Sequence, residues 1–170
     1  MKEIMLLKLG ELVLKGLNRG NFEKRLMKNL AWRIRNFGEF KIYCMQSTIY
    51  VEPQSESCDM DAAFEAATKV FGVVNVSRAA ECEKDIEKIM ETAKEYLKDE
   101  LSYAKTFKVE AKRSDKSFPM KSPEIAITVG GELHDAFENL EVDVKNPEVC
   151  VRVEVRDNAA YVHAGQLKGA

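Results

Sequence analysis

The sequence has no long apolar run. No stretch approaches the roughly 20 apolar residues that a membrane helix needs. The short apolar run at the N-terminus, MKEIMLLKLGE, is interrupted by Lys8 and Glu11, which does not suit an export signal. The sequence therefore predicts a cytoplasmic protein with no membrane partner.

Residues that build reactive centres are also scarce. The chain has four widely separated cysteines, Cys44, Cys58, Cys82 and Cys150. They form none of the close pairs that bind zinc or exchange disulfides, so we expect them to be reduced. The two histidines, His134 and His163, have no recognisable catalytic partner, and no glycine-rich phosphate-binding motif is present. From these residues we predict no catalytic residue, no metal site and no cofactor in this chain.

Charge is unevenly distributed, although the formal net charge is only -2. Residues 1–52 carry 10 basic and 5 acidic side chains, residues 53–104 carry 6 and 12, and residues 105–170 carry 10 and 11. Between residues 105 and 121, six cations face only Glu110 and Asp115. The acidic total excludes a general polycation but is compatible with a local basic surface.

Residues 1–80 are predicted to form a first domain. Apolar periodicity predicts a strand over 2–9, a helix over about 21–37, two strands within 40–53, a helix within 59–72 and a strand over 73–80. The turn between the two middle strands is expected at Gln46 and Ser47. This order is typical of a ferredoxin-like split βαβ sandwich, which places the chain in the α+β class.

Residues 81–170 are predicted to form a second, α/β domain packed against the first. We expect an amphipathic helix over 82–101, a half-buried strand over 106–113, a helix beginning at 122 and a hairpin over 148–165. Ser122 is expected to cap the third of these elements, with Pro123 in its first position. The hairpin turn is expected at Asp157 and Asn158.

The basic loop KRSDKSFPMKSPE, residues 112–124, is the strongest candidate site. Its cations and aromatic residue are Lys112, Arg113, Lys116, Phe118 and Lys121. Free backbone N–H groups at the following helix start favour an anion, and Phe118 is placed to stack on a base. The alternative is that Phe118 packs into the core beneath the loop while the lysines only solvate it. A second basic set in the first domain comprises Lys15, Arg19, Lys24, Arg25 and Lys28.

Three runs resemble the tRNA 4-thiouridine synthetases, the tRNA sulfurtransferases of the ThiI family. KLGELVLKGLNRGNFEKRL resembles the start of the family's ferredoxin-like domain. VEAKRSDKSFPMKSPEIAITVGGEL resembles the core of the THUMP domain that follows it, and VHAGQLKGA resembles the segment before the catalytic domain. The resemblance implies a ferredoxin-like domain in residues 1–80 and a THUMP domain in residues 81–170.

The resemblance also implies tRNA as the partner. In this family the two domains grip the acceptor stem and 3′ CCA end and position uridine 8 for 4-thiouridine formation. The chemistry belongs to a C-terminal PP-loop domain that uses ATP and Mg²⁺, receives sulfur from a cysteine desulfurase and also serves thiamine biosynthesis. Its SGGxDS-type motif does not occur in this sequence. We therefore expect a non-catalytic, tRNA-binding part of a longer protein.

By this resemblance, the tRNA contacts are expected at Lys15, Asn18, Arg19, Lys112, Arg113, Lys116, Phe118, Lys121 and Ser122. The alternative function is a ferredoxin-like regulatory or oligomerisation module that binds a small ligand or a protein. Binding of that kind would survive high salt, whereas phosphate contacts would not.

Overall fold

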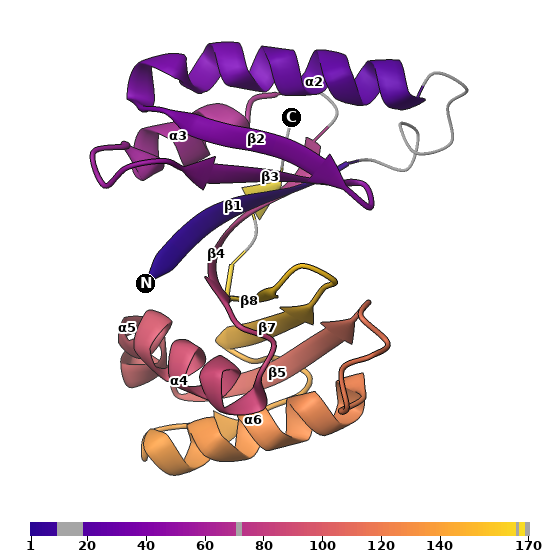
Figure 1. The fold of residues 1–170 in the computed structure, drawn as a ribbon. Helices are drawn as coiled ribbons and strands as arrows, with labels where there is room; N and C mark the ends of the chain where they lie inside the picture. The colour runs from indigo at the N-terminus through magenta and orange to yellow at the C-terminus, as the bar shows by residue number, and fades with distance from the viewer. Residues whose placement is uncertain (10–18, 71–72, 166, 169–170) are drawn as a thin grey trace. The chain divides into compact units, whose positions relative to one another are not determined.

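The computed structural model describes residues 1–9, 19–70, 73–165 and 167–168, and the chain divides into two compact units. The N-terminal unit comprises residues 3–78 and the last residues of the chain, and the C-terminal unit comprises residues 1–2 and 79–165. Strand β4 (Val73–Cys82) contributes its first part to one unit and its last part to the other. Figure 1 shows the helices and strands of each unit.

The N-terminal unit has the order of elements that the sequence predicts. Its elements are β1 (Lys2–Leu9), α2 (Arg19–Ile34), the 3₁₀ turn η1 (Arg35–Phe37), β2 (Phe40–Met45), β3 (Thr48–Pro53), α3 (Met60–Ala67) and β4. The strands are ordered β2-β3-β1-β4, and the short β9 (Leu167–Lys168) also pairs with β4. The predicted ferredoxin-like sandwich is therefore confirmed.

The core of the N-terminal unit lies between its helices and one face of its sheet (Figure 1). Helix α2 buries Leu26, Leu30 and Ile34, which recur every four residues and so share one side of the helix. They belong to the same apolar cluster as the sheet residues Met5 and Val51. The sequence predicts this helix to residue 37, whereas the last turn is a 3₁₀ turn that ends before Gly38.

The β2–β3 turn has the backbone that a tight hairpin requires. Gln46 and Ser47 have φ angles of 49° and 65°, in the left-handed region. Two-residue hairpin turns with positive φ at both positions match the twist of the flanking strands. The predicted turn is therefore confirmed at these two residues.

The C-terminal unit is a mixed sheet with helices packed against it. Its strands are ordered β4-β8-β7-β5-β6, where β5 is Thr106–Arg113, β6 is Glu141–Val142, β7 is Val149–Val155 and β8 is Ala160–His163. Its helices are α4 (Ile86–Tyr96), α5 (Lys98–Tyr103) and α6 (Ser122–Ala136). Strand β5 is parallel to β7, and β7 pairs antiparallel with β8 across the predicted turn.

The core of the C-terminal unit is formed by alternate strand residues and one stripe of each helix. Phe107, Val151 and Val153 are at most 1% exposed, as are Ile125 and Val129 on the predicted stripe of α6. Figure 1 shows α4 and α6 against the sheet of β5, β7 and β8. Outward-facing β5 residues are polar, which confirms the predicted half-buried strand.

One predicted helix is wrong in its extent. The sequence predicts a single helix over 82–101, but β4 continues to Cys82 and two helices follow. The Asp85 carboxylate accepts hydrogen bonds from the backbone N–H groups of Glu87 and Lys88 at 2.8 and 3.3 Å, which fixes the start of α4. Leu97 then leaves helical geometry, with φ -103° and ψ 17°, between α4 and α5.

Gly38 is expected to tolerate no side chain. Its φ is 138°, and a Cβ at this position would lie 2.6 Å from Cys58 Sγ and 2.9 Å from Cys58 Cα. Gly38→Ala should lower the free energy of unfolding by roughly 1–3 kcal/mol, measured by urea denaturation. Gly20→Ala is the matched control, because nothing lies within 4 Å of its added Cβ. Equal stability of both variants would contradict the strain at Gly38.

Candidate nucleic-acid interface

The basic loop joins the end of β5 to the start of α6 and is fastened to β7. The backbone N–H groups of Ser114 and Asp115 both donate to the Val155 carbonyl, at 2.9 and 3.3 Å. The Phe118 N–H donates to the Asp115 carbonyl at 3.2 Å, which turns the chain back toward the sheet. The loop therefore has a defined backbone path.

Asp115 is the electrostatic anchor of the loop and is only 8% exposed. Its carboxylate accepts hydrogen bonds from Lys84 Nζ at 2.7 Å, and from the N–H and Oγ of Ser117 at 3.0 and 2.6 Å. The Lys84 contact, followed by the two from Ser117, lowers the pKa of Asp115 from 3.8 to about 2. Lys84 also donates to the Asp157 carbonyl at 2.8 Å, so one ammonium group joins this loop to the β7–β8 turn.

Three lysines around the loop remain available to a ligand. Lys112, Lys116 and Lys121 are exposed, and their ammonium groups have no hydrogen bond or ion pair with any residue that the structure describes. Between the end of β5 and the start of α6, the one acidic residue, Asp115, is already paired with Lys84. These three lysines, called here the loop lysines, therefore present unneutralised positive charge.

Fewer cations between residues 105 and 121 are free than the sequence indicates. Lys108 pairs with Glu110 at 2.8 Å, and the other oxygen of Glu110 accepts from Arg152 Nη1 at 2.9 Å. The hydrogen bond from Lys108 is the main reason that the pKa of Glu110 is lowered. Glu110 therefore offsets one of these two positive charges, and neither cation is as free as a lysine of the loop.

Phe118 and Arg113 have structural roles in the loop. Phe118 is 6% exposed and packs in the core of the C-terminal unit. Arg113 is half-buried and its Nη1 donates to the Phe118 carbonyl at 2.9 Å. The proposed stacking of a base on Phe118 is therefore wrong, because its ring is already covered by protein. The alternative that it packs beneath the loop is confirmed.

The start of α6 differs from the prediction by one residue. Lys121 is the N-cap, because its carbonyl accepts the Ile125 N–H at 3.0 Å, and no side chain caps the helix. Ser122 is therefore the first helical residue and not the cap. The uncapped N–H groups of the first turn add positive potential beside Lys121, partly offset by Glu124.

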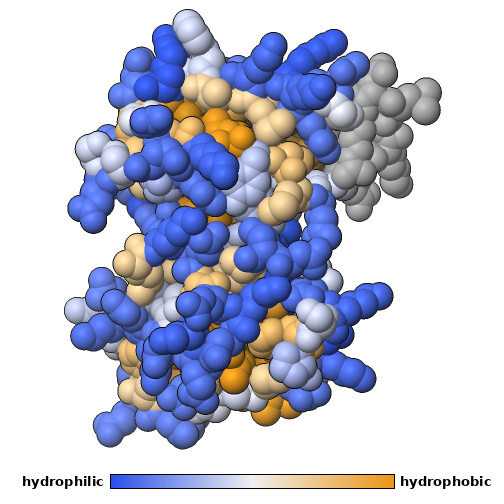
Figure 2. All heavy atoms as spheres, in the orientation of Figure 1, coloured by the Kyte–Doolittle hydropathy of each residue, from blue (hydrophilic) through white to orange (hydrophobic). Residues whose placement is uncertain are grey.

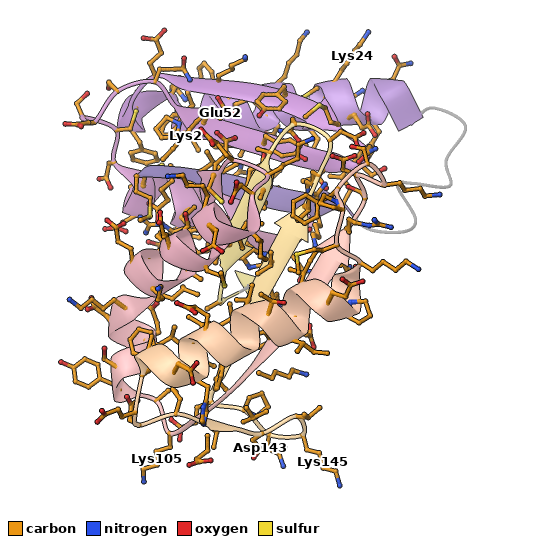
Figure 3. The ribbon with its side chains drawn as sticks, turned by 60° about the horizontal axis from the view of Figure 1, so that its bottom comes forward. Lys2, Lys24, Glu52, Lys105, Asp143 and Lys145 are labelled. Atoms are coloured by element: carbon orange, nitrogen blue, oxygen red, sulfur yellow. The ribbon has the colours of Figure 1, made fainter. Side chains whose placement is uncertain are left out.

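The second basic set, in the N-terminal unit, lies partly outside the described residues. Lys15 and the side chain of Arg19 lie outside them, as does the predicted contact Asn18, and the Arg19 backbone begins α2. Lys24, Arg25 and Lys28 are exposed on α2, and Figure 3 shows Lys24 pointing outward from this helix. They line a hollow of about 510 Å³ together with Asn21, Met27, Ala31 and Ile42. Figure 2 shows mainly hydrophilic side chains projecting from α2 at the top of that view.

Trp32 is a candidate binding residue that the sequence prediction missed. Its side chain is 64% exposed on α2, and the Arg35 guanidinium carbon lies 3.4 Å from the centroid of its ring. The sequence contains one signal that points to this residue. Trp32 lies four residues after Lys28 and seven after Arg25, which places it with these cations on the side of the helix opposite the apolar stripe.

The C-terminal unit also has an apolar hollow of about 580 Å³ between α6 and the β5–β6 edge of the sheet. Exposed apolar side chains line it, among them Ile127, Val142 and Val144, at 76%, 60% and 70% exposure. Within the described ranges, no three His, Cys, Asp or Glu side chains are grouped to hold a metal ion. No helix in these ranges has the length and apolar content to cross a membrane.

Comparison with protein families gives two adjacent matches. Residues 4–77 match the ThiI ferredoxin-like domain, and residues 83–163 match the THUMP domain. A probable tRNA sulfurtransferase of Caldanaerobacter subterraneus is 41% identical over 170 residues, all of this chain and 43% of the relative. One from Acetivibrio thermocellus is 44% identical over 159 residues, 92% of this chain and 41% of the relative. The chain thus spans about two fifths of these relatives.

Solved structures give the same result for the fold. A 4-thiouridine synthetase in complex with RNA and bound ATP is similar with a TM-score of 0.83 and 26% identity, over 99% of this chain and 42% of that one. The protein PH1313 from Pyrococcus horikoshii is similar with a TM-score of 0.84 and 31% identity, over 99% of this chain and 55% of that one.

Loss of the Asp115 carboxylate should loosen the loop in a pH-dependent way. Because the pKa of Asp115 in the folded state lies below its ordinary 3.8, its contribution to stability is present above about pH 4 and is lost as the pH falls toward 2. Asp115→Asn should therefore lower the melting temperature at neutral pH, and the difference from wild type should shrink as the pH falls through that range. A difference that does not change with pH would contradict the charged pairing with Lys84.

Proposed function

Because the chain belongs to the ThiI family, with a ThiI ferredoxin-like domain followed by a THUMP domain, we propose that it binds tRNA through the loop lysines and the start of α6. The observation that carries this proposal is the set of three exposed ammonium groups, Lys112, Lys116 and Lys121, left unpaired among the described residues. The similar 4-thiouridine synthetase was solved with RNA, which supports RNA as the ligand class.

Binding by this surface is electrostatic and geometric. The loop lysines neutralise phosphates and release their counterions. Uncapped N–H groups at the start of α6 donate to phosphate oxygens, as helix N-termini do in many anion sites. The Lys84–Asp115 pair and the hydrogen bonds to Val155 hold the loop in place before RNA arrives, which lowers the entropic cost of binding. No described loop side chain is placed to read a base, so sequence dependence is expected to be weak.

We extend the proposal to a specific part of tRNA. The two domains grip the acceptor stem and the 3′ CCA end, so that uridine 8 reaches a PP-loop domain for 4-thiouridine formation. In this proposal, ATP and Mg²⁺ belong to that domain. A cysteine desulfurase that supplies sulfur, a role in thiamine biosynthesis and a cytoplasmic location complete the proposal for the whole protein.

A second candidate function is favoured by one observation, the apolar hollow between α6 and the β5–β6 edge. Its volume of about 580 Å³ suits a small apolar ligand or a segment of another protein. Exposed Ile127, Val142 and Val144 would lose contact with water on such binding. This function needs no phosphate contacts, so salt separates it from the first.

Salt titration tests the electrostatic proposal. If about six phosphates are neutralised, the logarithm of the tRNA association constant should fall with the logarithm of salt concentration at a slope of roughly -4 to -5. The combined variant Lys112→Ala, Lys116→Ala and Lys121→Ala should weaken binding roughly tenfold or more at low salt and reduce the slope by about 2–3. Filter binding measures both quantities.

A matched control removes the same charge elsewhere in the same unit. Lys88, Lys98 and Lys145 are exposed lysines outside the loop. Changing all three to alanine should leave tRNA affinity and the salt slope near the wild-type values. If both triple variants lose affinity equally, binding depends on net charge and the assignment to the loop is wrong.

Trimmed RNA tests the finer proposal. Whole tRNA, tRNA without its CCA end and an acceptor-stem minihelix should be compared by gel shift. We expect the minihelix to keep most of the affinity and the trimmed tRNA to lose part of it, because single-stranded ends offer phosphates and bases that a duplex hides. Equal affinity for trimmed and whole tRNA would remove the CCA end from the proposal.

The variant Ile127→Asp tests the second candidate function. Binding or self-association through the apolar hollow should persist in high salt and be lost in this variant, since a carboxylate cannot be buried there without large cost. Under the tRNA proposal, Ile127→Asp leaves tRNA affinity unchanged. Sedimentation velocity and tRNA binding on the same samples separate the two functions.

A further inference from the structure

We propose that the outer face of α2 is a second RNA-binding site, in which an unpaired base stacks on Trp32. This inference rests on the proposed function in taking RNA as the ligand, but it concerns a different domain and a different kind of contact. The loop lysines offer positive charge without an accessible aromatic ring, because Phe118 is buried. The face of α2 offers both.

The residues of this face are set by helical spacing. Asn21, Arg25, Lys28 and Trp32 follow one another at steps of three or four residues, so they share one side of α2. Arg35, the first residue of η1, comes three residues after Trp32 and contacts its ring. That side of α2 is opposite to the buried stripe of Leu26, Leu30 and Ile34. Each of the five residues is exposed.

The charge of this face has one sign. Lys24, Arg25 and Lys28 have no ion pair or hydrogen bond with any residue in the described part of the chain. The one acidic residue of α2, Glu23, lies four residues before Met27 and seven before Leu30, on the half-buried side. A row of unneutralised cations is complementary to a phosphodiester backbone.

The Arg35 guanidinium lies over the Trp32 indole, and much of Trp32 is exposed. The Arg35 guanidinium carbon lies 3.4 Å from the ring centroid, and Arg35 Nη1 donates to the Trp32 carbonyl at 2.5 Å. These contacts restrict the rotamers of both side chains and lower the entropy that stacking would cost. Trp32 as a residue remains 64% exposed, and in this proposal a base stacks on the ring face opposite Arg35.

An unpaired nucleotide fits these features better than a duplex. A duplex presents phosphates to the lysines but keeps its bases stacked inside, so the indole would gain nothing. A single strand can place a base on Trp32 while neighbouring phosphates contact Arg25 and Lys28. The adjacent hollow of about 510 Å³, with Met27, Ala31 and Ile42 among its apolar lining residues, offers space for a further base or ribose.

The fluorescence of Trp32 provides a direct test, because it is the one tryptophan of the sequence. The complete 170-residue chain should be titrated at low salt with a short oligoadenylate, with an abasic oligomer of equal length and with a blunt RNA duplex. Binding is measured independently by anisotropy of a labelled strand. We expect oligoadenylate to quench the indole emission, and the abasic oligomer and duplex to bind without quenching.

Substitutions give the second readout. Trp32→Ala should weaken oligoadenylate binding about tenfold without changing the affinity for the abasic oligomer, and Trp32→Phe should retain most of the affinity. Tyr103→Ala is the matched control, since Tyr103 is an 88% exposed aromatic residue on α5. Melting temperatures check that each variant is folded.

The outcomes separate this inference from the proposed function. RNA that binds with unchanged Trp32 emission, or with equal affinity to Trp32→Ala, overturns the stacking site and leaves the loop-lysine proposal intact. Equal quenching by the abasic oligomer would mean that the face binds any polyanion, including an acidic protein segment, and this result too overturns the inference. Failure of every RNA to bind overturns both proposals.

Discussion

The pairing of Asp115 with Lys84 is the interaction on which the candidate site depends. It engages the Asp115 carboxylate beneath the loop, so that this group does not neutralise the nearby lysines. It also joins the loop to the β7–β8 turn, because Lys84 contacts the Asp157 carbonyl as well. A buried or half-buried ion pair of this kind adds little net stability by itself, but it fixes geometry. In the proposed function, the fixed backbone of the loop positions the three loop lysines for phosphates.

The two units use the same elementary arrangement, helices packed on one side of a sheet, and in the two proposals they offer different contacts to RNA. The C-terminal unit presents charge at the junction of a strand and an uncapped helix, where backbone N–H groups add to it. The N-terminal unit presents charge along one side of a helix, with an aromatic ring among the cations. Phosphate contacts suit the first surface, and a combination of phosphate and base contacts suits the second. Together they would recognise the shape and strand state of an RNA more than its sequence.

The proposed function assigns the positioning of the RNA to these two domains. Residues that bind a substrate far from the reacting atom supply binding energy that an active site elsewhere can use. Relatives of which this chain spans about two fifths are probable tRNA sulfurtransferases. In the proposed function, these two domains hold the RNA while the chemistry proceeds in another domain.

Local periodicity by itself determined most elements of both units. Apolar residues at steps of two share one face of a strand, and those at steps of three to four share one face of a helix, so the pattern depends only on nearby residues of the chain. It placed α2, the Gln46–Ser47 turn and the β7–β8 hairpin. Tertiary structure decided the features that residue spacing does not encode. It put the Phe118 ring in the core, divided the helix after Asp85 at Leu97, and paired Lys84 with the sequence-distant carboxylate of Asp115. The loop lysines were visible as cations in the sequence, but only the fold showed that they are unpaired, because neutralisation depends on which charges meet in space.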